Sequence, residues 1–176
     1  MNLRKATWVA TACLGIAFSA SAQQKQRLSF VLPPGNSKYT QQHEIEVGDA
    51  PGHKLRLYEL QRTFPKDGPV IEGTRLVELW IRGIADFIDM NGLATVHTVY
   101  VFENGDKFFV RSDLVAATDA GKSTTLTAGR ITGGTGKFRS VQGIIRVASS
   151  PEPGSGLMRS AFDIDYWFDV RDKGGG

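Results

Sequence analysis

The sequence is short of cysteine, of long apolar stretches and of unbalanced charge, and each shortage excludes a class of protein. Cys13 is the only cysteine in 176 residues, so a disulfide framework and a zinc–thiolate site are excluded. Beyond the N-terminus the chain has no apolar run long enough for a membrane-spanning helix. The 21 Lys and Arg residues are balanced by 18 Asp and Glu residues and form no basic block that could follow a phosphate backbone. Membrane channels and nucleic-acid binders are therefore disfavoured.

Residues 1–22 have the pattern of an export signal. Arg4 and Lys5 form a basic start, a short apolar core follows, and the small-x-small pattern of residues 20–22 precedes a cleavage site at Gln23. Cleavage there would remove the only cysteine together with the signal. We therefore expect a secreted or periplasmic protein.

The rest of the chain is long enough for one domain, and no internal repeat or linker divides it. We expect an irregular leader over residues 23–42, one domain over 43–171 and a flexible tail over 172–176. Segments of the domain rich in Val, Ile, Thr and aromatic residues end at Gly, Pro or Asn, which is typical of strands. The predicted strands cover residues 44–47, 53–64, 74–90, 92–103, 106–116, 123–132, 141–148 and 157–170.

This succession of strands predicts an all-β fold, an eight-stranded antiparallel up-and-down β-barrel with a hydrophobic lumen. Closure into a barrel removes the strand edges that long apolar strands would otherwise expose. Asn104 and Gly105 lie between two predicted strands and are the strongest hairpin signal, because both residue types tolerate the positive φ of a tight primed turn.

Alternation along residues 53–64 predicts which side chains enter the lumen. The even-numbered residues include three basic side chains, whereas the odd-numbered ones carry a single charge. Because basic side chains prefer solvent, we predict that the odd-numbered set faces inward. This set contains Leu55, Leu57, Glu59 and Gln61.

Three other strands alternate more regularly between apolar and charged residues. A β-bulge at Gly83 would shift the register of the first of them. The residues predicted to face the lumen are Val77, Leu79, Ile81, Ala85 and Phe87 in the first strand, Phe108, Val110 and Leu114 in the second, and Phe162, Ile164, Tyr166 and Phe168 in the last.

Glu59 is the main candidate for chemistry in this lumen. A carboxylate removed from water is costly unless it is paired or hydrogen-bonded, and its pKa tends to rise. An inward Glu59 would therefore serve proton transfer or charge stabilisation, with Gln61 beside it to hold a ligand oxygen or a water. The alternative is a structural Glu59 that pairs with an arginine at the barrel mouth.

The glycine-rich segment 131–138 fits neither of two known nucleotide motifs. A phosphate-binding loop would need Gly in place of Ile131 and Ser or Thr in place of Phe138. A dinucleotide fingerprint would need Gly in place of Arg139, within a strand–helix–strand unit. We predict a tight turn between strands, with positive φ at glycines such as Gly134 and with Phe138 filling one end of the barrel.

The same segment carries a family resemblance. The stretch GRITGGTGKF at residues 129–138, followed by VQG at 141–143, resembles the GGTGKF…G signature of plant allene oxide cyclases, dirigent proteins and their bacterial barrel relatives. Weaker similarity covers the hairpin at 98–110 and LYELQ at 57–61, which resembles the YEIN stretch of the cyclases. The resemblance implies an exported bacterial member of this superfamily, with an eight-stranded barrel and a hydrophobic cavity.

The cyclase resemblance implies roles for three residues. In the cyclases the Glu of the YEIN stretch stabilises developing positive charge, its Asn helps to hold a water, and a Pro follows in the next turn; Glu59, Gln61 and Pro69 stand near these places. The cavity Cys of the cyclases has no counterpart in the mature chain, and Asp113 stands near the place of their cavity Tyr. This incomplete set favours binding without catalysis.

No metal and no cofactor are expected. His43, His53 and His97 lack the spacing of metal ligands, and no Ser-His-Asp set forms from neighbouring motifs. Asp163 and Asp165 alternate along a predicted strand, so they form a solvated face rather than a calcium loop.

Two functions stay open, and both use the lumen. The first is an exported protein that binds a small hydrophobic or aromatic molecule without catalysis. The second is an enzyme, either a cyclase- or isomerase-like one that confines its substrate beside Glu59 and Gln61, or a dirigent-like guide of radical coupling. The expected ligand contacts are Leu55, Leu57, Pro69, Phe108, Val110, Phe162 and Tyr166.

The resemblance also implies a homotrimer, because the related families are commonly trimers. In the predicted alternation Tyr58, Leu60 and Trp80 lie on the barrel exterior. They are therefore the expected contacts between subunits, unless the N-terminal leader covers them.

Overall fold

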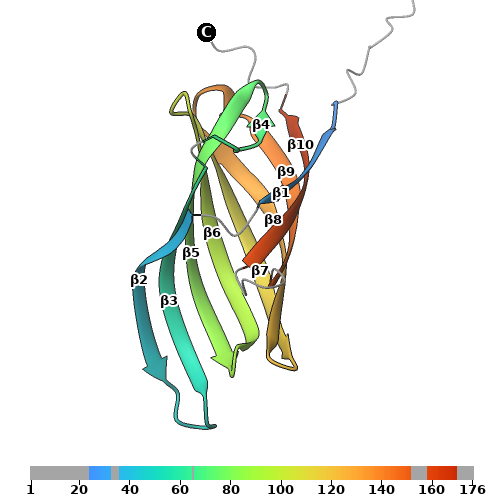
Figure 1. The fold of residues 1–176 in the computed structure, drawn as a ribbon. Helices are drawn as coiled ribbons and strands as arrows, with labels where there is room; N and C mark the ends of the chain where they lie inside the picture. The colour runs from blue at the N-terminus through green and yellow to red at the C-terminus, as the bar shows by residue number, and fades with distance from the viewer. Residues whose placement is uncertain (1–23, 33–35, 65, 152–157, 170–176) are drawn as a thin grey trace, which may run out of the picture.

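The protein is nearly all β, as predicted (Figure 1). The computed structural model describes residues 24–32, 36–64, 66–151 and 158–169. The predicted export signal and the predicted C-terminal tail lie outside the described residues. No helix in the described part of the chain is long and apolar enough to cross a membrane.

The strands from residue 53 onward match the predicted ones closely. The elements are β1 (Gln26–Leu32), β2 (Asn36–Glu46), β3 (His53–Thr63), β4 (Val70–Ile71), β5 (Thr74–Ile88), β6 (Asn91–Phe102), β7 (Lys107–Asp119), β8 (Lys122–Gly134), the 3-10 helix η1 (Gly136–Phe138), β9 (Val141–Pro151) and β10 (Met158–Phe168).

Most of the predicted irregular leader over 23–42 is strand where the structure describes it. Residues 26–32 form β1, which pairs with β10, and residues 36–46 form β2, which pairs with β3. Hydrogen bonds to these neighbouring strands order a polar stretch whose composition alone does not indicate a strand.

The strands form one antiparallel meander that curls into a barrel (Figure 1). Their order is β1-β10-β9-β8-β7-β6-β5-β3-β2, and β4 pairs with β5 beside this path. Among the described residues β1 and β2 do not pair with each other, so hydrogen bonds do not close the sheet. We call the line between β1 and β2 the seam. The predicted barrel class is thus confirmed, with β1 and β4 added to the predicted strands, the predicted strand 44–47 lengthened into β2, and the seam left open.

The hairpin at Asn104 and Gly105 forms as predicted, but its turn is of another type. The backbone N–H of Phe102 donates to the carbonyl of Asp106, and the N–H of Gly105 donates to the carbonyl of Phe102, both at 2.9 Å. Gly105 has a φ of 85°, whereas Asn104 is not among the residues with positive φ. The loop is therefore a three-residue loop that ends in a left-handed glycine, rather than a two-residue primed turn.

The predicted positive φ of Gly134 is wrong. Positive values occur instead at Gly133, with φ 143°, and at Gly136, with φ 51°. Gly134 is needed for space, because a Cβ atom there would lie 2.5 Å from the carbonyl oxygens of Lys107 and Phe138. The glycine therefore permits a close approach of two backbones.

Aromatic side chains fill one end of the barrel, which we call the packed end. Phe138 of η1 is fully buried, as predicted, and its ring centroid lies 4.4 Å from that of Phe102 and 5.7 Å from that of Phe108. Tyr100 stacks on Phe108 at 4.2 Å. The glycine-rich segment thus places a plug of aromatic rings in the core.

Polar contacts fasten the turn between β4 and β5 to the packed end. The Tyr166 hydroxyl lies 2.8 Å from Glu72 Oε1 and 2.9 Å from Gln26 Oε1, and its single hydrogen is donated to one of these oxygens at a time. Lys137 Nζ donates to the carbonyl oxygen of Glu72 at 2.6 Å. These contacts hold β1, β10 and η1 around one turn.

The predicted lumen faces of β5, β7 and β10 are confirmed, with one exception. A register shift between Leu76 and Glu78 places Leu76 in the core instead of Val77. Gly83 lies in regular register, so the alternative of a bulge at that residue is excluded.

The predicted orientation of β3 is wrong. Tyr58, Leu60 and Arg62 of β3 line a cavity in the lumen, whereas Leu55 and Leu57 lie on the outer face and are 41% and 52% exposed. Tyr58 and Leu60 are therefore not exterior contacts either.

Acidic residues of β2 explain why basic side chains of β3 lie on its inward face. Lys54 Nζ lies 3.3 Å from Glu44 Oε2 and 3.0 Å from Glu46 Oε1, and Arg56 also pairs with Glu44. The rule that basic residues seek solvent fails here because β2, whose pairing with β3 was not predicted, supplies carboxylates.

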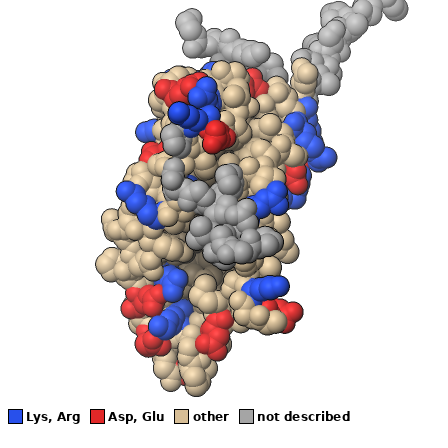
Figure 2. Space-filling view, in the orientation of Figure 1, with Lys and Arg blue, Asp and Glu red and all other residues tan. Residues whose placement is uncertain are grey.

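Charges of both signs are interspersed on the surface. The face shown in Figure 2 has neighbouring Lys or Arg and Asp or Glu side chains, separated by wide uncharged areas. Asp165, for example, accepts from both Arg27 and Arg146, which lower the pKa of this carboxyl.

Candidate functional site

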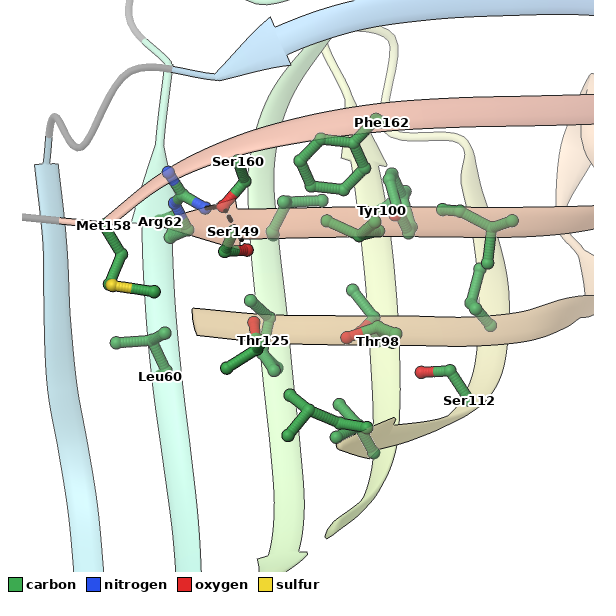
Figure 3. Close-up of a pocket in the computed structure, with 18 of the residues that line it drawn as sticks. Leu60, Arg62, Thr98, Tyr100, Ser112, Thr125, Ser149, Met158, Ser160 and Phe162 are labelled. Atoms are coloured by element: carbon green, nitrogen blue, oxygen red, sulfur yellow. Dashed lines mark hydrogen bonds between the residues drawn. The ribbon is translucent and has the colours of Figure 1, made fainter. Parts of the chain in front are cut away.

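A cavity of about 220 Å³ lies in the barrel lumen (Figure 3). Its wall includes members of the large core cluster at the packed end and of a smaller cluster around Ala85, Ala94 and Val96. Ligand pockets commonly measure about 300–1,000 Å³, so this cavity suits a small molecule. The apolar part of the wall includes Leu60, Leu79, Ile81, Val110, Ile145 and Val147.

One side of the cavity is polar and consists of Arg62, Ser149 and Ser160, which we call the arginine corner (Figure 3). Arg62 is only 6% exposed, and its Nη1 donates to Ser160 Oγ at 3.2 Å. Ser160 Oγ lies 2.9 Å from Ser149 Oγ, and either hydroxyl can be the donor. Because Arg62 is on β3 and Ser160 on β10, this hydrogen bond joins the two sides of the seam.

Arg62 is the only charged side chain among the described residues that line the cavity. Burial lowers the pKa of its guanidinium, and the neighbouring Tyr100 opposes this change. The ordinary pKa of arginine lies so far above neutral pH that the side chain keeps its charge in proteins. The lumen therefore holds a fixed positive charge.

Tyr58 and Tyr100 in the cavity wall stay protonated. Burial raises the pKa of Tyr58 to about 12, and burial also raises the pKa of Tyr100 well above its ordinary value. Both hydroxyl groups are consequently neutral at physiological pH.

Short Ser and Thr side chains in the wall leave part of the cavity volume unfilled. Thr98 and Ser112 are buried, and Thr125 and Thr127 are half-buried in the cavity wall. No fully buried side-chain nitrogen or oxygen among the described residues lacks a hydrogen-bond partner. The wall thus offers a few placed polar groups in mostly apolar surroundings.

Tyr39 of β2 and Tyr58 of β3 line the outer part of this wall. Tyr39 is 51% exposed, and its ring meets that of Tyr58 edge-on at 5.9 Å. Gly83 is the cross-strand partner of Tyr58, and a Cβ atom at Gly83 would collide with the tyrosine ring. Glycine at this position therefore lets Tyr58 lie flat across β5.

The structure separates the predicted ligand contacts into three groups. Val110 and Phe162 line the cavity, as predicted. Phe108 and Tyr166 face inward but belong to the packed end. Leu55 and Leu57 lie on the outer face, and Pro69 is not among the cavity residues; its carbonyl accepts from the backbone N–H of Leu76.

Glu59 and Gln61 lie on the outer face, so their predicted place in the lumen is wrong. Glu59 Oε2 lies 2.7 Å from Arg82 Nε, and Thr40 Oγ1 donates to Glu59 Oε1 at 2.6 Å. The hydrogen bond from Thr40 has the largest effect on the Glu59 carboxyl, and the contact with Arg82 acts in the same direction. Together they lower the pKa of this carboxyl instead of raising it. Gln61 donates to the Glu78 carboxylate.

Sequence reasoning missed the arginine corner. Ser149 and Ser160 have the same alternation phase as Val147 and Phe162, so the pattern of β9 and β10 already indicated inward hydroxyls. Arg62 was missed because all basic residues of β3 were predicted to face solvent.

The described residues contain no group of three or more His, Cys, Asp or Glu side chains that could hold a metal ion. His53 instead lies between two carboxylates, with Nδ1 2.5 Å from Asp49 and Nε2 2.7 Å from Asp86. Hydrogen bonds to Asp86 and Asp49 raise the pKa of this imidazole.

Comparison with known proteins finds structural similarity to dirigent proteins. The pterocarpan synthase dirigent protein GePTS1 aligns with a TM-score of 0.48 and 15% identity over 93% of this chain and 99% of that chain. The pterocarpan synthase dirigent protein PsPTS1 aligns with a TM-score of 0.47 and 16% identity over 82% of this chain and 96% of that chain. No family model and no curated protein matches the sequence. The fold described above rests on the strand order and register of this chain.

Proposed function

We propose that this protein binds a small hydrophobic or aromatic molecule in the barrel lumen and does not transform it. The observation that carries the proposal is the cavity of about 220 Å³, whose wall is mostly apolar with a few buried polar groups. Such a composition is typical of small-molecule sites, where apolar contacts supply affinity and polar groups fix orientation.

The cavity wall supports binding better than catalysis. No Asp, Glu or His occurs among the described lining residues, and Glu59 is paired with Arg82 outside the lumen. Tyr58 and Tyr100 are poor general bases because their pKa values are raised. The cyclase- or isomerase-like alternative therefore loses the two residues, Glu59 and Gln61, on which it depended.

Native mass spectrometry of protein purified from its own host tests this proposal. We expect a bound small molecule that is released unchanged when the protein is denatured. Conversion of an added candidate ligand would contradict binding without catalysis. A change in the stereochemistry of coupled phenoxy radicals would favour the dirigent-like alternative.

We further propose that the protein works outside the cytoplasm. Support comes from the basic start, apolar core and small-x-small site within residues 1–22. Intact-mass analysis of the exported protein should give an N-terminus at Gln23. A mass that retains residues 1–22 would contradict export by cleavage at this site.

We propose self-association, as a homotrimer, through an apolar row on the outside of the barrel. The row crosses neighbouring strands in register, from Leu93 through Val115 to Leu126, and continues through Ala148 and Ala161 to Val31. Leu126 is 67% exposed, and contiguous exposed apolar surface commonly marks a contact between proteins. This row replaces the predicted contacts Tyr58 and Leu60, which face the lumen.

Sedimentation of a Leu126→Glu variant tests the proposed assembly. We expect the wild type to be trimeric at micromolar concentration and the variant to be monomeric, because the new charge would be desolvated in the contact. Thr124→Glu, an exposed position two residues away on the same strand face, is the matched control. A monomeric wild type would reject the assembly and leave the binding proposal intact.

A further inference from the structure

We propose that a groove on the outside of the barrel binds a linear acidic polysaccharide, with Arg130 and Arg139 holding its carboxylates and Trp167 contacting a sugar ring. The groove lies between β8 and β9, beside η1, and we call it the outer groove. The inference goes beyond the proposed function, because it needs no ligand in the lumen. It uses the proposed export only to choose a saccharide chain among linear polyanions.

The outer groove forms where β8 and β9 separate. The last pair in register between these strands is Ile131 with Gly143. Beyond this pair β8 stays on β7, with which Gly133 is paired, and η1 then connects to β9. Two hollows of about 300 and 430 Å³ lie at this place, and both are bordered by Thr132 and Gln142. The two hollows therefore adjoin each other and form one groove.

Two exposed guanidiniums border the outer groove, and neither is neutralised within the described part of the fold. Arg130 borders one hollow and Arg139 the other. Across the described residues, the side-chain hydrogen bonds and ion pairs of arginine all belong to other arginines. The two positive charges at the groove are therefore available to an anion.

Arg111 of β7 adds to the positive charge beside Arg130. The two residues are cross-strand partners, and Arg111 is likewise exposed and without an ion pair among the described residues. Like charges directly opposite each other destabilise a sheet. An anion bound over the pair would offset their repulsion.

The acidic residues near the outer groove already have partners. Asp169 borders one hollow and accepts from Gln142 Nε2 at 3.4 Å. Asp165, on the strand next to β9, accepts from Arg27 and Arg146. Positive charge therefore predominates at the groove, so an anionic partner fits it and a cationic one does not.

Trp167 supplies an aromatic surface at the same groove. It is half-buried on the outer face of β10, where its cross-strand partner is Gln142. Lys25 Nζ lies 5.3 Å from the centroid of the Trp167 ring and adds a further cation. Aromatic rings pack against the apolar faces of sugar rings, and the side chains of Thr132 and Gln142 can exchange hydrogen bonds with sugar hydroxyls.

The arrangement fits a chain rather than a single anion. Arg130 and Arg139 border different hollows, so one small anion in either hollow would leave the other guanidinium unused. A linear polyuronate carries a carboxylate on every sugar ring and can therefore reach both. The near balance of charge over the whole chain disfavours a nucleic acid, and the proposed export brings the protein to the compartment of acidic polysaccharides.

The outer groove is separate from the apolar row proposed for self-association. Arg130 is four residues from Leu126 along β8, about 14 Å at the rise of an antiparallel strand. Trp167 is six residues from Ala161 along β10, about 20 Å by the same rise. The two surfaces thus use different residues and can be tested independently.

Calorimetric titration of the full mature chain with matched probes tests the inference. The probes are tetragalacturonate and its methyl ester, which has the same sugar rings without the negative charges. We expect the acid to bind the wild type at least about ten-fold more tightly than the ester, as expected for several exposed ion pairs acting together. This preference should shrink as the salt concentration rises, because salt screens charges on a surface.

Arginine variants locate the recognition of the carboxylates. Arg130→Gln and Arg139→Gln should each weaken binding of the acid by about two- to five-fold and leave binding of the ester unchanged. Arg159→Gln is the matched control, because it removes an exposed arginine of the same sheet, eight residues from Trp167 along β10. The melting temperature of Arg130→Gln should not fall, since the change removes a like charge opposite Arg111.

Tryptophan fluorescence locates the saccharide itself. Beyond the predicted signal the chain has two tryptophans, Trp80 and Trp167. We expect tetragalacturonate to change the fluorescence of the wild type and of Trp80→Phe. In Trp167→Phe the change should disappear.

Each contrary outcome overturns the inference and leaves ligand binding in the lumen untouched. If the ester binds as tightly as the acid, the groove does not recognise charge. If Arg130→Gln and Arg139→Gln behave like Arg159→Gln, or if the fluorescence change persists in Trp167→Phe, the saccharide binds elsewhere. If oligothymidylate of equal charge binds as tightly as tetragalacturonate, the surface recognises any polyanion and the polysaccharide is not its specific partner.

Discussion

The packed end and the hollow middle of the barrel are built on the same strands with the same alternation, yet only one of them is filled. On β6, Phe102 fills the packed end, Tyr100 belongs to the packed end and also borders the cavity, and Thr98, the next inward residue, lines the cavity. On β7, Phe108 is packed, whereas Ser112 lines the cavity. Both positions face the lumen, so side-chain size at the inward positions decides whether the barrel is core or cavity.

This difference separates stability from binding. Aromatic contacts at the packed end bury large apolar areas and stabilise the fold. The cavity lacks this packing. Its buried Arg62 and short hydroxyl side chains are polar groups that need hydrogen-bond partners. We therefore expect substitutions at the packed end to change mainly stability and substitutions in the middle to change mainly ligand binding.

Phe138→Ala should produce the largest loss of stability. The substitution removes a fully buried ring that contacts Phe102 and Phe108, so the free energy of unfolding should fall by about 3–5 kcal/mol. Chemical denaturation measures this loss. Phe109→Ala, which removes a half-buried ring from the outer face of β7, is the control and should lose clearly less. Equal losses would contradict the packed end as the main core.

Gly134→Ala should have the next largest effect. Its Cβ atom would lie 2.5 Å from two carbonyl oxygens, those of Lys107 and Phe138, so the strands must separate and the free energy of unfolding should fall by about 1–3 kcal/mol. Thermal unfolding measures the change, with the exposed Thr132→Ala as control. An unchanged melting temperature would reject the close approach of these backbones.

Val147→Phe should abolish ligand binding at little cost in stability. Val147 lines the cavity, so the added ring can occupy existing space, and we expect a change in unfolding free energy within about 1 kcal/mol. Titration with a small aromatic probe such as phenol and thermal unfolding measure the two effects. Ser150→Phe adds the same ring to an exposed position of β9 and should leave binding unchanged. Destabilisation comparable to that of Phe138→Ala would show that the middle is packed.

Glu59→Gln should have the smallest effect. Glu59 pairs with Arg82 and accepts from Thr40 on the outer face, so ligand binding should not change. Because its pKa is lowered in the folded protein, Glu59 stabilises the fold above its unfolded-state pKa, and this contribution is lost as the pH falls through the folded-state value. The melting temperature should therefore fall slightly at neutral pH and not at strongly acidic pH. A loss of ligand binding in this variant would show that Glu59 belongs to the ligand site.

The sequence predicted the fold where apolar and charged residues alternate without ambiguity. In β7 the charged neighbours Lys107, Arg111 and Asp113 leave one possible inward face, and the structure has that face. The same clarity applies to β10, where Phe162 and Ile164 alternate with Asp163 and Asp165.

The site was harder to predict because its decisive contacts cross the seam. β3 carries its three basic residues on one face and Leu55 and Leu57 on the other, so local polarity favoured the wrong face. The carboxylates of β2 and the hydroxyl of Ser160, which is 98 positions from Arg62 in the chain, make the inward basic face possible. Alternation alone does not show partners so far away in sequence.

Methyl NMR of the mature protein titrated with a small aromatic probe such as phenol tests the central claim, that the lumen is the ligand site, most directly. Leu60, Ile81 and Val147 place methyl groups in the cavity wall, whereas Leu57 and Ile84 place them on the outer face. Our account predicts saturable shifts of the cavity methyl groups with the outer ones unchanged. Shifts confined to the outer methyl groups, or no shifts at ligand concentrations that saturate small-molecule sites, would contradict it.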